Sequence, residues 1–510
     1  MGFMSSMENT LNGNEFNKNY TENGALGYRS SGKSLLDINF KASSLRRAGE
    51  NEITSSFEKA FAEDKIHALK WLFYLRDARE GLGERRSARI IMRYLASTEP
   101  EIMKALVPLM GEYGRFDDLF CLVGTDCEED VLMYVKKQLE IDKVQMKKNK
   151  PISLVAKWLP SCNASAARTK ELGAIVRKYL GMNKAEYRKM LSEMRKYIDV
   201  VERKMSAGEW GAIDYERVPS KANILYKNAF LKHDEERRRA YLESLEKGEA
   251  KINSSVNFPH DIVHGYVGGG WRFNANNKED KTLEALWKAL PDMVKENGST
   301  LVVRDGSGSM CCSADPNSSV TALEVATALA IYFAERSSGE FKDKFITFSS
   351  RPALIDMSNL NTLAEKIRRC YAENDTSNTN IKATFNLILS TAVRTHMKQE
   401  DMPRNILIIS DMEFDGATTG RVNETLFQTI AKKYEDAGYK LPRLVFWNVN
   451  SRTGTIPVKE NDLGVALVSG FSVNVCKMVL SGELDPYKCL IEQLDTERYA
   501  PVEAAVKDLV

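Results

Sequence analysis

The stretch LVVRDGSGSM, residues 301–310, decides how the C-terminal part of this chain folds. A short β-branched run breaks abruptly into an acid, a glycine and alternating hydroxyls. The run predicts a buried strand, and Asp305, Ser307 and Ser309 stand at its C-terminal end. Ligands of parallel α/β sheets bind at that end of the strands. The stretch therefore predicts a strand together with a ligand site at its end.

Similar runs recur after residue 297 and alternate with segments of helical periodicity. This rhythm of strand and helix predicts a mostly parallel, doubly wound α/β sheet with helices on both faces. The four further predicted strands are DKFITFSS (343–350), RNILIISD (404–411), PRLVFWNV (442–449) and GVALVSG (464–470).

Hydroxyls and carboxylates gather at the predicted strand ends. The D-x-S-x-S loop supplies one carboxylate and two hydroxyls, which are hard oxygen donors suited to Mg²⁺ or another divalent cation. Two later loops reach the same edge, and they carry Thr379 and Asp411. A capped turn without metal and a weakly occupied site are the alternatives, and Glu413 is either a spare ligand or solvated. The predicted metal ligands are Asp305, Ser307, Ser309, Thr379 and Asp411.

The preceding part of the chain has a different texture. Residues 1–35 are rich in Asn, Gly, Ser and Thr and are predicted to be a flexible segment. From residue 36 to 296 the pattern is helical, with short turns between amphipathic segments. This pattern predicts stacked antiparallel helix pairs, a helical-repeat solenoid of the HEAT type. Residues 297–510 then form the α/β domain.

Positive charge is concentrated in one part of the helical region. The chain has a net charge of only +2, yet residues 143–204 hold 16 basic and five acidic residues. In the segment 183–206 the apolar side chains fall on one helical face and the basic ones on the other. The basic face is either simply solvated or contacts a phosphate backbone, without sequence-specific readout. The candidate RNA-binding residues are Lys184, Arg188, Lys189, Arg195, Lys196, Arg203 and Lys204.

The composition indicates in which cellular compartment the protein is expected. The eight cysteines include no C-x-x-C pair, which favours a reducing cytoplasm over a disulfide framework or a structural zinc site. The N-terminus is polar, and no apolar window is long enough to span a membrane. We therefore expect a cytoplasmic protein without a membrane partner.

The order D-x-S-x-S, then Thr379, then Asp411 resembles the metal-ion-dependent adhesion site of von Willebrand factor type A domains. The resemblance implies that Ser307, Ser309 and Thr379 contact a Mg²⁺ ion. Asp305 and Asp411 would contact it directly or through water. It also implies that a carboxylate of an Asp or Glu on a partner protein completes the coordination.

A longer resemblance covers roughly residues 20–500. It is to an uncharacterised domain family that joins a helical N-terminal region to a type A domain, and this architecture is similar to the Ro autoantigen (TROVE) proteins. The similarity to Ro proteins implies helical repeats that close into a ring and bind structured small RNA. The motifs that carry the resemblance are FYLRDAREGLGERR (73–86), YGRFDDL (113–119), ISLVAKWLPS (152–161), VPSKANILYKNAF (218–230) and KIN (251–253) before VVRDGSGSM.

These observations favour a non-enzymatic binding scaffold over two other classes. One alternative is a protein-protein interaction module without RNA binding, and the other is a metal-dependent hydrolase, for which Glu413 is the candidate base. His260 and His264 have the spacing of a zinc-binding helix, but no third ligand is evident. No G-x-S-x-G motif is present, so a serine hydrolase is not indicated.

Overall fold

The computed structural model describes residues 17–22, 26–270, 273, 279–294, 299–314, 318–348, 352–374, 381–413, 426–457, 465–472 and 485–510. The chain divides into two compact units. One unit is formed by the described residues of 1–64 and 254–494, and the other by residues 65–253 and 495–510. Both units are therefore discontinuous in sequence, unlike the domains predicted from the sequence.

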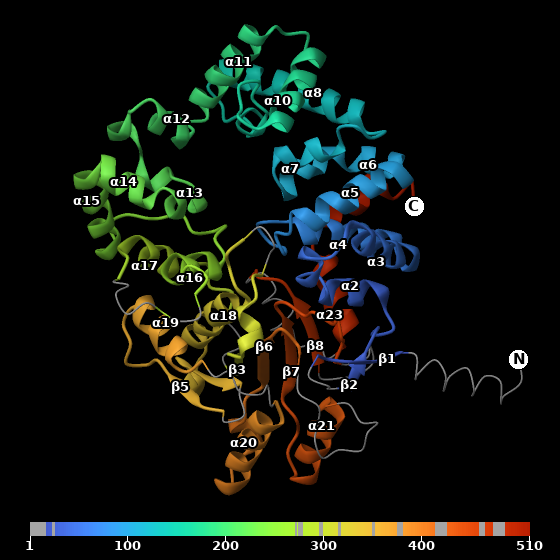
Figure 1. The fold of residues 1–510 in the computed structure, drawn as a ribbon, viewed down its shortest axis with the longest axis vertical. Coiled ribbons are helices and arrows are strands. Elements are labelled where there is room, and N and C mark those ends of the chain that lie inside the picture. The colour runs from blue at the N-terminus through green and yellow to red at the C-terminus, as the bar shows by residue number, and fades with distance from the viewer. Residues whose placement is uncertain are drawn as a thin grey trace, which may run out of the picture. The chain divides into compact units, whose positions relative to one another are not determined.

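The first unit is built on a six-stranded sheet with the strand order β5-β4-β3-β6-β7-β8 (Figure 1). All neighbouring strands are parallel except β4 and β5, which are antiparallel. The predicted mostly parallel sheet is confirmed, and β5 is an added edge strand. The strands are β3 (Thr300–Asp305), β4 (Lys344–Phe348), β5 (Leu354–Asp356), β6 (Asn405–Ser410), β7 (Arg443–Asn448) and β8 (Val465–Ser469).

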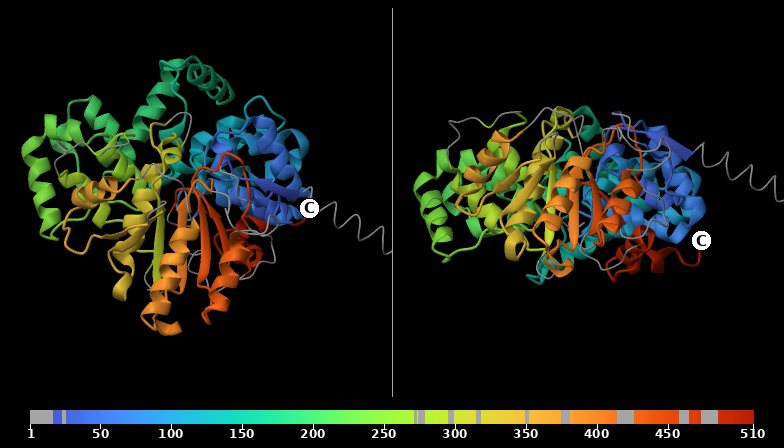
Figure 2. Two further views of the ribbon diagram at one scale, coloured as in Figure 1. Left: turned by 60° about the horizontal axis from the view of Figure 1, so that its bottom comes forward. Right: turned by 90° about the horizontal axis from the view of Figure 1, so that it is seen from below.

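Helices follow the strands in the predicted rhythm. Every residue of β3, β6 and β7 is buried, as expected for parallel strands covered on both faces. Helix α18 packs against β3, β4 and β6. The connection from β3 to β4 runs in one direction along the sheet, whereas the connections to β6 and then to β7 run in the opposite direction. Because crossovers between parallel strands are right-handed, α18 lies on one face of the sheet and α20 and α21 lie on the other (Figure 2). The helices are α18 (Ala322–Arg336), α19 (Leu363–Ala372), α20 (Ile381–Arg394), α21 (Leu426–Asp436) and α23 (Pro486–Leu494).

The N-terminal segment belongs to this α/β unit. Strands β1 (Lys18–Tyr20) and β2 (Leu26–Tyr28) form an antiparallel hairpin, and Tyr28 exchanges two backbone hydrogen bonds of 2.8 Å with Ile456. The flexible segment predicted for residues 1–35 is therefore wrong for residues 17–22 and 26–35. Backbone pairing with residue 456 orders them, and no local pattern encodes that contact.

The next residues also contact the sheet. Helix α2 (Ser34–Phe40) packs against β8. The side chain of Asn448 donates to the carbonyl of Phe40 over 2.8 Å, and the Oγ of Ser469 lies 2.9 Å from that of Ser43. Helices α3 (Glu50–Glu63), α16 (Pro259–Val267) and α17 (Lys281–Lys288) complete the unit.

The second unit is helical throughout its described residues. The C-terminal helix α24 (Ala500–Val506) packs against α4 and α6 of this unit, and Arg498 pairs with Asp77 over 2.8 Å. The last 16 residues are thus part of the helical unit and not of the predicted α/β domain. The unit contains α4 (Lys65–Arg76), α5 (Arg86–Thr98), α6 (Pro100–Leu106), α7 (Met110–Tyr113), α8 (Glu128–Lys147), α9 (Val155–Trp158), α10 (Ala167–Tyr179), α11 (Lys184–Tyr197), α12 (Val201–Ser206), α13 (Ser220–Leu225), α14 (Lys227–His233), α15 (Glu235–Glu246) and α24.

Buried ion pairs explain two of the sequence motifs in the helical unit. Arg76, from FYLRDAREGLGERR, pairs with the fully buried Asp118 of YGRFDDL over 2.7 Å. Arg89 reaches the other oxygen of Asp118 over 2.6 Å. These motifs therefore hold neighbouring helices together. Within the described residues, no helix is both long and apolar enough to cross a membrane.

Candidate functional site

The predicted site lies at the topological switch point of the sheet. Strands β3 and β6 are parallel neighbours, and the chain leaves their ends in opposite directions, toward β4 and toward β7. Ligands of parallel sheets bind at such a reversal, at the C-terminal ends of the strands. Asp305 ends β3 and Ser410 ends β6, so both stand at this switch point.

The D-x-S-x-S loop folds around Asp305. The backbone N–H of Ser307 donates to one carboxylate oxygen over 2.9 Å, and the Ser410 hydroxyl donates to the other over 2.6 Å. The hydroxyls of Ser307 and Ser309 lie 3.0 Å apart. The Asp305 side chain is fully buried, and this burial raises its pKa.

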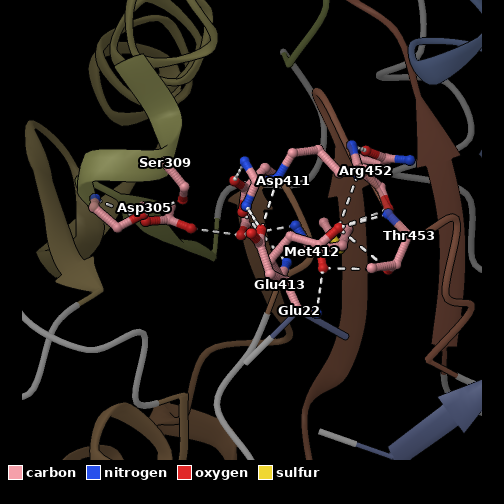
Figure 3. Close-up of polar contacts among 12 residues, drawn as sticks. Glu22, Asp305, Ser309, Asp411, Met412, Glu413, Arg452 and Thr453 are labelled. Carbon is pink, nitrogen blue, oxygen red and sulfur yellow. Dashed lines mark hydrogen bonds and ion pairs between the residues drawn. The ribbon is translucent and has the colours of Figure 1, made fainter. Parts of the chain in front are cut away.

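Asp411 faces the same cluster from the end of β6. It is fully buried and pairs with Arg452 over 3.1 Å (Figure 3). The Ser309 hydroxyl is a hydrogen-bond donor to it. Burial, followed by the negative charge of Asp305, raises the pKa of Asp411 to about 7. Two buried carboxylates therefore repel each other here, and a cation bound between the strand ends would relieve that repulsion.

Glu413 performs a different task from the one considered in the sequence. Its buried carboxylate accepts the backbone N–H groups of Glu22, Arg452 and Thr453 over 2.7, 2.8 and 2.9 Å (Figure 3). The Thr453 hydroxyl lies 3.2 Å from each of its oxygens. Glu413 is thus an anchor that fixes the loop after β7 and the N-terminal hairpin, rather than a solvated residue.

Arg452 connects this anchor to the predicted metal ligands. Its guanidinium contacts both Asp411 and Glu22, with an Nε to Oε2 distance of 2.8 Å to the latter. Arg452, Ser410 and Glu22 are not among the residues predicted from the sequence. Ser410 could have been found, because it precedes Asp411 in the same strand end. Glu22 could not, since it lies 430 residues from its partner.

The donor set fits a small divalent cation. Asp305, Ser307, Ser309 and Asp411 come together as predicted, whereas Thr379 lies outside the described residues. Within the described residues, no group of three or more His, Cys, Asp or Glu side chains has the arrangement of a metal site. The described part of the predicted site consists of two carboxylates and two serine hydroxyls, and hydroxyl and carboxylate oxygens suit Mg²⁺.

The basic segment of the helical unit forms two helices rather than one. The predicted apolar face is confirmed for α11, where Tyr187, Met190, Leu191 and Met194 are buried. The chain then breaks at Asp199, which has a left-handed φ of 61°, before α12 begins. The basic residues of α12 therefore do not continue the face of α11.

Only part of the candidate RNA-binding set is exposed. Lys184, Arg188, Lys189 and Lys196 lie at the surface. Arg195 does not, because its guanidinium donates to the carbonyls of Ala156 and Leu159, each over 2.9 Å. Burial accordingly lowers the pKa of Arg195.

The two candidates in α12 are also engaged within the unit. Arg203 pairs with Glu209 over 2.9 Å. Lys204 pairs with Asp199 and donates to the carbonyl of Ala212, each over 2.8 Å. The prediction that Arg195, Arg203 and Lys204 belong to an exposed basic face is wrong. Tertiary contacts, which the helical periodicity does not report, draw these side chains inward.

A second group of lysines lies beside α11. The Tyr197 hydroxyl at the end of α11 donates to the carbonyl of Lys150 over 2.9 Å, which brings the end of α8 to the same place. Lys147, Lys148 and Lys150 are exposed there. The exposed basic surface is defined from here on as Lys147, Lys148, Lys150, Lys184, Arg188, Lys189 and Lys196.

Comparison with known proteins places the chain among relatives whose function is not known. Residues 299–505 match a domain of unknown function (DUF7788), and residues 21–113 and 167–300 match another (DUF2828). The crystal structure of the Deinococcus radiodurans Ro (RSR) protein is similar with a TM-score of 0.41 and 12% identity, covering 86% of this chain and 93% of that chain.

A full-length relative gives the clearer result. The uncharacterized protein L728 of Acanthamoeba polyphaga mimivirus is 30% identical over 526 residues. The match covers 95% of this chain and 89% of the viral protein. The chain therefore belongs to the protein family that includes this mimivirus protein.

Proposed function

We propose that this protein is a cytoplasmic binding scaffold with two recognition surfaces. Its α/β unit is a type A domain that binds Mg²⁺ through Asp305, Ser307, Ser309, Thr379 and Asp411. The bound ion captures an Asp or Glu carboxylate of a partner protein. Its helical-repeat unit contacts structured small RNA through the exposed basic surface.

One observation carries the metal part of the proposal. Asp305 and Asp411 are both fully buried at neighbouring strand ends, and the pKa of each is raised. Buried like charges are costly unless a cation compensates them. Arg452 supplies one positive charge but shares it with Glu22. A divalent cation would supply the remaining charge and polarise an incoming carboxylate.

The surroundings of this site favour binding over catalysis. Glu413 was the candidate general base of a metal-dependent hydrolase. Its oxygens already accept three backbone N–H groups and a threonine hydroxyl, and a base must keep a lone pair available for the proton it takes. The hydrolase alternative at the metal site therefore loses its candidate base.

Isothermal calorimetry with Mg²⁺ tests the metal site directly. Wild type should bind the ion, and Asp305→Asn should lose binding while keeping its side-chain size. Asp401→Asn is the matched control, because Asp401 is an exposed acid of the same unit in the turn before β6. Equal Mg²⁺ heats for wild type and Asp305→Asn would refute the proposal.

The exposed basic surface supports the RNA part of the proposal. Lys184, Arg188 and Lys196 project from α11 and form no ion pair among those found in the described residues. Exposed cations attract phosphates in a salt-dependent way that does not depend on base sequence. The competing function, a protein-protein interaction module, would leave this surface merely solvated.

Gel shifts with a small structured hairpin RNA separate these two functions. The triple variant Lys184→Glu, Arg188→Glu and Lys196→Glu should weaken binding by about tenfold or more and flatten its dependence on salt. The control variant Lys232→Glu, Lys247→Glu and Lys251→Glu changes the net charge equally at exposed positions of the same unit. Equal losses in both variants, or no binding by wild type, would favour the protein-only function.

A further inference from the structure

A serine, a histidine and a glutamate are joined by two consecutive hydrogen bonds at the end of helix α16. His264 Nδ1 lies 2.9 Å from a carboxylate oxygen of Glu324, at the start of α18. His264 Nε2 lies 3.1 Å from the hydroxyl of Ser319, in the loop that precedes α18. Helices α16 and α18 pack against each other within the α/β unit. The three side chains thus stand in the order of nucleophile, base and acid.

Glu324 is held rigidly by its surroundings. It is fully buried, and its Oε2 accepts the backbone N–H of Thr321 over 2.8 Å in a capping box. Its Oε1 accepts the backbone N–H of Gly269 over 2.8 Å as well as facing His264. A carboxylate so fixed can orient an imidazole, as the acid of a catalytic triad does.

The geometry also fixes the roles of the two histidine nitrogens. A carboxylate only accepts hydrogen bonds, so the Nδ1 of a neutral His264 carries the proton that faces Glu324. Nε2 is then the acceptor, and the Ser319 hydroxyl is its donor. This is the arrangement in which a histidine withdraws a proton from a serine.

The serine and the histidine are also accessible to solvent. Ser319 is exposed, and the His264 side chain keeps 26% of its surface accessible while Glu324 keeps none. A structural link between α16 and the loop before α18 would need the histidine bond to Glu324. It would not need an exposed serine on the other nitrogen.

We propose that Ser319, His264 and Glu324 form a second functional site in which Ser319 is a nucleophile that hydrolyses carboxylic esters. Ser319 and His264 are its catalytic residues, and Glu324 is the positioning residue. None of its members is a predicted ligand of the metal edge. The site is not predicted from the sequence, because Ser319 is not in a G-x-S-x-G motif and His264 lies 55 residues away from it in the chain.

The chemistry balances without any cofactor. The Ser319 Oγ forms a bond to the ester carbonyl carbon while its proton passes to His264 Nε2. The carbon–oxygen bond to the alcohol breaks, and the departing oxygen takes that proton. Water then attacks the acyl group through the same histidine, releasing the carboxylic acid and restoring the serine hydroxyl.

A fluorophosphonate probe on the full-length protein tests the nucleophile. Attack by Ser319 forms a phosphorus–oxygen bond and expels fluoride, so intact-mass spectrometry should show one adduct, which peptide mapping places on Ser319. Ser319→Ala and His264→Gln should each lose the adduct, whereas the neighbouring Ser318→Ala should keep it. Absence of an adduct in wild type, or its persistence in Ser319→Ala, would overturn the proposal.

The pH profile distinguishes a base from a merely structural histidine. Glu324 of α18 and Asp261 of α16 face His264, and the hydrogen bond to Glu324 raises its pKa above 6.5. The rate of labelling, and of p-nitrophenyl acetate hydrolysis, should therefore rise with pH to a plateau whose midpoint lies above 6.5. A folded His264→Gln variant, verified by its melting temperature, that labels at the wild-type rate would also overturn the proposal.

Discussion

The hydroxyl of Ser410 donates to the carboxylate of Asp305 over 2.6 Å and thereby joins the ends of strands β6 and β3. The same hydroxyl oxygen accepts the backbone N–H of Met412 over 3.0 Å, which turns the chain so that Asp411 faces the metal edge. Met412 has a left-handed φ of 63°, a conformation that such a turn must stabilise. One serine therefore sets the geometry of two predicted ligands.

Replacement of this serine tests that relationship. Ser410→Ala leaves a buried carboxylate oxygen without its donor, so the free energy of unfolding should fall by about 1–3 kcal/mol in chemical denaturation with EDTA present. Its affinity for Mg²⁺ should also fall in calorimetry. Ser390→Ala, at an exposed position of α20, should leave both quantities unchanged. A Ser410→Ala variant that unfolds and binds as wild type does would show that the bond contributes little.

Two glycines of the D-x-S-x-S loop should respond differently to the same substitution. A Cβ at Gly306 would lie 2.9 Å from Nη2 of the buried Arg304, whereas a Cβ at Gly308 meets nothing within 4 Å. Gly306→Ala should therefore lower the free energy of unfolding by about 1–3 kcal/mol, and Gly308→Ala should lower it by less than about 1 kcal/mol. Thermal denaturation compares the melting temperatures of the two variants, and equal decreases would contradict the crowding of the new Cβ against Arg304.

Two adjacent basic residues in α11 should also behave in opposite ways. Arg195→Ala removes the donor to the carbonyls of Ala156 and Leu159, so we expect a loss of stability of about 1–3 kcal/mol. Lys196→Ala, at an exposed position, should change stability by no more than about 0.5 kcal/mol but weaken RNA binding. If Lys196→Ala lost more stability than Arg195→Ala in urea unfolding, Arg195 would belong to the exposed surface.

The link between α16 and α18 should make stability depend on pH. The hydrogen bond to Glu324 raises the pKa of His264 in the folded protein above its ordinary value of 6.5. A group whose pKa is higher in the folded than in the unfolded protein stabilises the folded state fully at pH values below its unfolded pKa. That stabilisation is lost as the pH rises through the folded pKa. The difference in unfolding free energy between wild type and His264→Gln should therefore be largest below pH 6.5 and shrink above it. A difference that does not vary with pH would exclude this linkage.

The α/β architecture and most of the metal edge could be predicted from local sequence patterns. Runs such as TLVVRD and RNILIISD are apolar enough for strands buried on both faces, and the intervening segments have helical periodicity. Because parallel strands end at one edge, the residues that follow them must meet, and Asp305, Ser307, Ser309 and Asp411 do meet. Local pattern and topology were sufficient for these positions.

The surroundings of those residues depend on long-range packing. Glu22 reaches Arg452, Ser319 meets His264, and Arg195 turns toward the carbonyls of a neighbouring helix. Each contact joins segments far apart in the chain. The hydrophobic periodicity of a segment indicates which face of the helix or strand a side chain occupies, but not which residues cover that face. The short-range hydrophobic pattern therefore encodes strands, helices and their edges, whereas long-range packing chooses the partners of individual polar groups.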